Sequence, residues 1–179
     1  MKYTAICIVV LLFSLCVSQE ETVKEAQDVS VTPLVTGPPI PHEVLKDIIT
    51  DYFQALNQRD MSTVTSLTHP YYIQDVGPFL DYVIDNNLLF DIVSISFLMD
   101  EEEFREMTEI LSDEEFQEQV GSRGVSYEVE LHVTMDAEVY EGFYLFIELG
   151  ETESGWYILD PALLQLVIEG TLEVYQSGG

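Results

Sequence analysis

The spacing of apolar residues changes along the chain, from a helical repeat after residue 42 to a strand repeat after residue 120. Between residues 43 and 58, apolar side chains recur three and four positions apart, which is the spacing of one face of an α-helix. The apolar positions are Val44, Leu45, Ile48, Ile49, Tyr52, Phe53 and Leu56. Charged and polar residues lie between them, so we expect a surface helix with one buried face.

Two further helices are predicted before residue 90. Asp60 is a suitable N-cap for a short helix that ends before His69-Pro70. Gly77-Pro78 then interrupt the chain, and the paired apolar spacing resumes at residue 79 and stops at Asn86-Asn87, which suit a helix end.

Residues 100–120 are strongly acidic and have two interpretations. Asp100 and Ser112 each precede a glutamate by three positions, the pattern of a capping box, which predicts two short helices. The alternative is a calcium loop, because the same runs are rich in carboxylate oxygens. An EF-hand loop needs alternating ligands, a central glycine and a distant glutamate, and neither run has them. The spacing therefore favours helix caps.

The other segments alternate with a period of two, as strands do. Residues 93–99 predict a half-buried strand and 125–135 a long strand with one solvated face. Residues 143–149 are apolar on both faces, so this strand should be central, and 156–159 predict a third strand of the group. The tail, 163–175, is apolar and rich in β-branched residues, which predicts one or two more strands.

The N-terminal residues have the pattern of a cleavable signal peptide. Lys2 precedes an apolar stretch at 5–17, and Cys16-Val17-Ser18 offers small residues for cleavage after Ser18. The stretch is shorter than the roughly 20 residues of a membrane span. We expect a secreted protein with a signal peptide at 1–18, a disordered acidic and proline-rich leader at 19–41 and a single domain at 42–176.

Cysteine usage limits how this domain is stabilised. Cys7 and Cys16 both lie in the predicted signal peptide, so the mature chain can form no disulfide. The hydrophobic core must therefore suffice alone, which is reasonable at this length. No N-x-S/T sequon is present.

The charge balance excludes several classes of partner. The chain has 33 acidic against 6 basic residues, a formal net charge of −27. Nucleic acids and anionic membranes are bound through clustered Lys and Arg, and the basic residues here are scattered. The charge is compatible with a solvated acidic surface, attraction to a cationic protein surface, or diffuse calcium binding.

The order of elements resembles the nuclear transport factor 2-like (SnoaL-like) superfamily over residues 43–160. The residues that carry the resemblance are the first-helix pattern at 52–60 and the last hairpin, with Glu141-Gly142 followed by Gly155-Trp156-Tyr157-Ile158. The resemblance implies an α+β fold in which N-terminal helices pack into a curved antiparallel sheet to make a cone-shaped roll. The acidic helical segment 100–120 departs from the family pattern, in which strands follow more directly.

The resemblance also implies a pocket in the cone, which members use for small apolar ligands or for acid/base enzymes, or simply fill. The catalytic candidates are His69 and Asp75, although a histidine before proline is more often a turn residue. The aromatic residues that could line such a pocket, and that are more often plain core, are Tyr52, Phe53, Tyr72, Tyr144, Phe146 and Trp156.

Other chemistries lack their motifs. There is no thiol outside the predicted signal peptide, no G-x-S-x-G elbow and no glycine-rich phosphate loop, so no metal site or cofactor is predicted. Three hypotheses remain: a secreted non-enzymatic binding module for a small apolar ligand or a cationic protein surface, an acid/base enzyme of isomerase or dehydratase type, and an extracellular matrix protein that binds calcium weakly.

Overall fold

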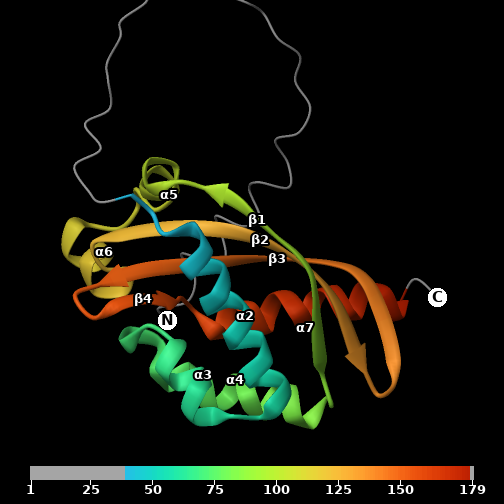
Figure 1. Ribbon diagram of the computed structural model, residues 1–179. Coiled ribbons are helices and arrows are strands. Elements are labelled where there is room, and N and C mark those ends of the chain that lie inside the picture. Colours follow the sequence, from blue (N-terminus) through green and yellow to red (C-terminus); the bar gives the residue numbers. More distant parts are fainter. Residues whose placement is uncertain (1–38, 178–179) are drawn as a thin grey trace, which may run out of the picture. The chain divides into compact units, whose positions relative to one another are not determined.

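The structure is a computed structural model that describes residues 39–177 (Figure 1). These residues form six α-helices, one turn of 3-10 helix and one four-stranded sheet, which confirms the α+β class. The helices are α2 (His42–Gln58), α3 (Met61–Leu67), α4 (Ile73–Asp85), α5 (Glu101–Met107), α6 (Asp113–Gln119) and α7 (Pro161–Ser177), and the 3-10 turn η1 is Pro70–Tyr72. The strands are β1 (Leu89–Met99), β2 (Arg123–Met135), β3 (Glu138–Thr152) and β4 (Gly155–Ile158).

The expected signal peptide at 1–18 lies outside the described residues, as does the expected leader except for residues 39–41. Between residues 39 and 177, no helix combines the length and the apolar character that crossing a membrane requires.

The sheet is antiparallel throughout, in the order β1-β2-β3-β4, so strands adjacent in sequence are adjacent in space. β3 pairs on both sides, which confirms the prediction that the strand around 143–149 is central. Asp136 and Ala137 join β2 to β3 with φ of 49° and 71°, the left-handed conformation that tight hairpin turns require. The sheet stays open and is not strongly curled (Figure 1), which is less curvature than the expected cone-shaped roll.

The strand predicted at 93–99 is present, but it is longer than the alternating pattern suggested, since β1 already begins at Leu89. Its pairing with β2 shifts twice, between Ile92 and Ser94 and between Phe97 and Met99. Such bulges insert an unpaired residue and increase the local twist. They break the simple alternation that the sequence suggested.

The main core lies between one face of the sheet, here called the inner face, and the helices α2 and α7. The Phe53 ring of α2 meets Phe90 of β1 edge-on at 5.4 Å, and Tyr175 of α7 stacks on Phe143 of β3 at 5.6 Å. The buried strand residues of this face include Val125, Tyr127, Val129, Leu131, Leu145 and Ile147. The predicted first helix is therefore confirmed, and most of its apolar stripe is buried, whereas Val44 at its start is exposed.

The prediction of strands at 163–175 is wrong, because this segment is helix α7. Leu164, Ile168 and Leu172 recur four positions apart and are all buried, so the helical stripe covers the sheet better than an added strand would. An Asp160 carboxylate oxygen accepts from the Leu163 N–H at 2.9 Å, and Pro161 occupies the first helical position, where prolines are favoured. Tertiary burial here outweighs the strand preference of the β-branched residues.

Helix α4 also starts earlier than predicted, at Ile73 rather than after Gly77-Pro78. Pro78 lies inside the helix, where its missing N–H removes one backbone hydrogen bond. The helix still forms because four residues of one stripe are buried, namely Val76, Phe79, Leu80 and Val83. The predicted end is confirmed, with Asn86 as the C-cap.

The acidic segment 100–120 forms the two predicted helices, and both capping boxes are present, at Asp100 with Glu103 and at Ser112 with Glu115. The helices cover one end of the opposite face of the sheet, here called the outer face. A Cβ on Gly124 of β2 would lie 2.4 Å from the Phe104 ring of α5, so only glycine fits there. A second, smaller core gathers around this ring and comprises Tyr72, Phe104, Phe116, Val120 and Leu159.

Candidate functional site

The histidine candidate, His69, sits at the start of η1 and is 97% buried, with only 3% of its surface exposed. Its Nδ1 accepts from the Tyr71 backbone N–H at 3.3 Å, and the backbone N–H of His69 donates to the carbonyl of Ile158 at 2.8 Å. Its ring lies edge-on to Tyr72 and Tyr157, at 6.1 and 6.2 Å. Burial lowers the pKa of His69, which keeps the imidazole neutral at physiological pH.

The second catalytic candidate, Asp75, lies in the first turn of α4, next to acidic groups that the sequence did not single out. Together with Tyr72, Glu148 of β3 and Asp160, it forms what is here called the acidic cluster, whose three carboxylates are half-buried. Burial raises the pKa of Asp75. Burial also raises the pKa of Asp160, and the negative charge of Asp75 adds to the shift.

Glu148 is the most perturbed carboxyl group of this cluster. Burial, and then the charge of Asp160, raise its pKa from 4.5 to about 7. The pKa of Tyr72 is raised as well, by burial first and then by the charges of Asp160 and Glu148. These shifts show that the groups lie close enough to interact. Within residues 39–177, no hydrogen bond or ion pair joins His69 to the carboxylates.

Ser126 of β2 borders the cluster, because it pairs directly with Glu148 across the sheet. Paired residues point to the same face with Cβ atoms about 5 Å apart. Ser126 is completely buried, and its Oγ has no hydrogen-bond partner in the described part of the chain. A carboxyl group that titrates near neutral pH beside tyrosine and serine hydroxyls has the components of an acid/base pair.

The aromatic candidates do not gather in one place. Tyr52 and Phe53 belong to the core on the inner face, where burial raises the pKa of Tyr52. Tyr72 belongs to the acidic cluster. Tyr144 and Phe146 point to the outer face and are 52% and 49% exposed. A single cavity cannot be lined by all of them, since the sheet separates the two groups.

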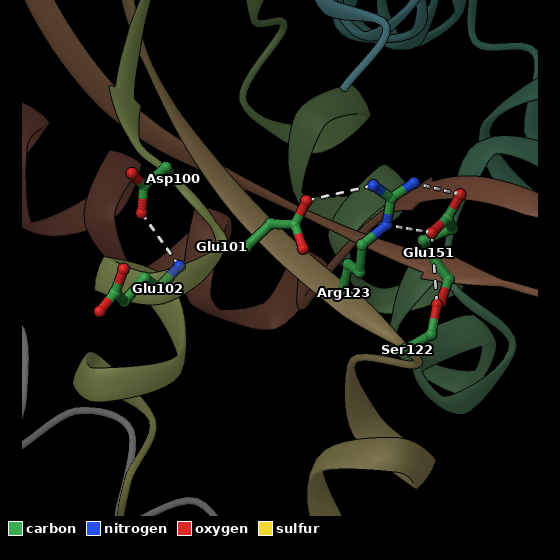
Figure 2. Close-up of polar contacts among 6 residues, drawn as sticks. All are labelled: Asp100, Glu101, Glu102, Ser122, Arg123 and Glu151. Carbon is green, nitrogen blue, oxygen red and sulfur yellow. Dashed lines mark hydrogen bonds and ion pairs between the residues drawn. The ribbon is translucent and has the colours of Figure 1, made fainter. Parts of the chain in front are cut away.

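Trp156, the sixth aromatic candidate, lies under an arginine in an ion-pair network. The Arg123 guanidinium is 5.3 Å from the centre of the Trp156 ring. Figure 2 shows the same guanidinium between Glu101 of α5, at 3.1 Å, and Glu151 of β3, at 2.9 Å. The Arg123 side chain is only 10% exposed. This network ties α5 to the sheet, which indicates a structural role for Trp156.

The uncovered part of the outer face carries a second group of side chains, here called the open patch. It consists of Ser94, Ser96, Glu128, Glu130, Tyr144 and Phe146. Register places these residues in two rows across three strands, with Glu130 between Ser94 and Tyr144 and Glu128 between Ser96 and Phe146. The charge of Glu130 is the first cause that raises the pKa of Tyr144. Carboxylates and exposed rings are therefore direct neighbours.

Sequence reasoning did not single out Glu128, Glu130, Glu148 and Asp160. One signal for Glu148 was available, because it is the only carboxylate in the even-numbered run from residue 142 to 148 of an otherwise apolar strand. Asp160 gave no comparable signal, since its proximity to Glu148 arises only from the pairing of β3 and β4.

The described residues contain no group of three or more His, Cys, Asp or Glu side chains that could hold a metal ion. No protein-family model matches the chain, and no curated protein matches it either.

Proposed function

We propose that the chain is a secreted, non-enzymatic binding domain that binds a cationic protein surface through its open patch. The observation that carries the proposal is the exposure of Tyr144 and Phe146 directly beside Glu128 and Glu130. Aromatic residues of central strands are normally buried, and exposed apolar patches rimmed by polar groups mark interaction sites.

The chemistry of the open patch suits a cation. A Lys or Arg side chain can pair with a carboxylate and at the same time lie over the face of an aromatic ring. The net charge of −27 would attract such a partner over a longer range and accelerate its encounter. An anionic partner would be repelled by the same field.

Two finer assignments accompany the proposal. The N-terminal helices and the antiparallel sheet support a relationship with the nuclear transport factor 2-like fold, with residues 100–120 as an insertion between β1 and β2. The pattern at residues 1–18 supports secretion, and intact-mass measurement of the protein from culture medium should find a chain that begins near Gln19.

Binding of a fluorescein-labelled decalysine peptide at low salt tests the function. Two double variants change the open patch, Glu128→Gln with Glu130→Gln and Tyr144→Ser with Phe146→Ser. The control, Glu114→Gln with Glu118→Gln, removes two negative charges from exposed positions of α6, as many as the glutamate variant of the patch removes. We expect each patch variant to bind about fivefold to tenfold more weakly than the control, given the usual strength of exposed ion pairs and cation–π contacts.

Equal affinities of the control and both patch variants would refute the proposal, because attraction would then depend on net charge alone. Thermal unfolding of each variant checks that the fold is retained. We expect the variants to lose affinity for the peptide but not stability, because all of the altered side chains lie at least partly in solvent.

The acidic cluster favours a second candidate function, acid/base catalysis. The pKa of about 7 for Glu148 is the observation behind it, since a general acid or base works best when its pKa is near the working pH. Ligand-observed NMR with a mixture of small apolar carbonyl compounds tests this candidate. Binding that is lost in Glu148→Gln but kept in Glu128→Gln would favour it over the binding module.

A further inference from the structure

The two rows of the open patch repeat the same chemistry at a fixed distance. In each row, a carboxylate of β2 lies between a serine of β1 and an aromatic residue of β3. The rows are two residues apart along every strand. Because a strand rises about 3.3 Å per residue, corresponding side chains of the two rows are about 7 Å apart.

Each row can receive one arginine. In the first, the Ser94 hydroxyl donates to a carboxylate oxygen of Glu130 at 3.2 Å and orients it, while Tyr144 supplies the ring. In the second, Glu128 and Phe146 offer the same pair of groups. A planar guanidinium can bind a carboxylate and stack on a ring at once, which an ammonium group does less well.

We propose that the partner presents an extended segment with arginines at alternate positions, i and i+2, and that both rest on the open patch. This inference rests on the proposed function. Residues i and i+2 of an extended chain point to the same side and are about 7 Å apart, which equals the separation of the two rows. Arginines at i and i+1 point to opposite sides, so only one of them can reach the patch.

A second copy of the chain does not meet this requirement. Among the described residues, the basic side chains of Lys46, Arg59, Arg105 and Arg123 all bind groups of their own chain. Nowhere in the sequence do two basic residues stand two positions apart. Stacking two outer faces would also bring the carboxylates of Glu128 and Glu130 against those of the partner copy, which is unfavourable.

Three synthetic dodecapeptides of glycine and serine test the inference. Each contains two arginines, separated by one residue, by none or by two, so that net charge is constant. We expect the peptide with one intervening residue to bind about fivefold more tightly than the others. In this peptide both arginines can form an ion pair and a ring contact with the open patch, whereas in the other two only one arginine can. This preference should disappear in the Glu128→Gln and Glu130→Gln double variant and persist in the control variant of α6.

The outcomes separate the two proposals. Equal binding of all three peptides that still depends on the patch residues overturns the spacing and leaves the proposed function standing. Binding that is unchanged when the patch residues are substituted overturns both the spacing and the proposed function. Sedimentation of the protein alone should find no dimer that depends on Tyr144 and Phe146, since such a dimer would make a second copy the occupant.

Discussion

The Glu148 carboxyl group should make the protein less stable as the pH rises through its titration range. Its pKa is about 7 in the folded chain, against a usual value of 4.5. Between these two values the folded state holds a proton that the unfolded state has released. The free energy of unfolding therefore falls as the pH rises from 4.5 to 7, and the cost is fully present above pH 7.

Replacing Glu148 with glutamine removes this cost and keeps the shape of the side chain. A shift of 2.5 pKa units corresponds to roughly 3 kcal/mol at pH 8 and to a little under 1 kcal/mol at pH 5. The stability advantage of Glu148→Gln over wild type should therefore grow by about 2.5 kcal/mol between these two pH values. A constant offset from the substitution itself cancels in this comparison.

Urea unfolding, followed by the fluorescence of Trp156, provides the measurement. A series from pH 5 to 8 avoids the sequence pI of about 4.1, where solubility is lowest. The control is Glu118→Gln, at an exposed position of α6. Parallel curves for Glu148→Gln and wild type across this range would contradict the reasoning, because they would mean that Glu148 is ionised in the folded chain without penalty.

Substitutions at three other positions test the rest of the fold. Phe53→Ala should lower the free energy of unfolding by about 3–5 kcal/mol in thermal or urea unfolding, because it leaves a void beneath Phe90 in the main core. A neutral result would mean that α2 does not pack there. Ser112→Ala should cost about 1 kcal/mol through loss of the α6 cap, and Ser112→Asp should restore most of it, by the same measurement. Arg123→Met should lower the free energy of urea unfolding by about 2 kcal/mol, because Glu101 and Glu151 lose their shared partner. Arg123→Lys should recover only part of this loss, since lysine cannot bridge both carboxylates in the same way.

Sequence alone predicted the elements that local chemistry determines. The stripe of α2 and the two capping boxes each depend on residues within a few positions of one another, and both features are present. Helix α7 was missed because its β-branched residues favour a strand, whereas the surface against which Leu164, Ile168 and Leu172 pack belongs to other elements. Such a surface cannot be inferred from the segment itself.

The candidate sites were harder to predict than the fold. Tyr144 and Phe146 were expected to be buried because β3 is apolar on both faces, and no local pattern reveals that helices cover only part of the outer face. The pKa of Glu148 is raised first by burial and then by the charge of Asp160, which approaches it through strand pairing and the start of α7. Asp75 and Tyr72 were identified, but as neighbours of His69 rather than of these carboxylates.

The two candidate sites lie on the same face of the sheet, and the helical segment 100–120 covers one end of that face. Along β2 the even-numbered residues point to one face, yet Ser126 is completely buried whereas Glu128 and Glu130 are partly exposed. Helix α5 covers the end of this face at Gly124, where its Phe104 ring leaves no room for a Cβ, and Val120 lies against Gly150 of β3. Burial, and then the charge of Asp160, raise the pKa of Glu148 on this face. Farther along, the rings of Tyr144 and Phe146 are about half exposed, and the carboxylates of Glu128 and Glu130 are partly exposed. One part of the outer face thus holds a carboxyl group of raised pKa, and the uncovered part holds the side chains that the proposed cationic partner would contact.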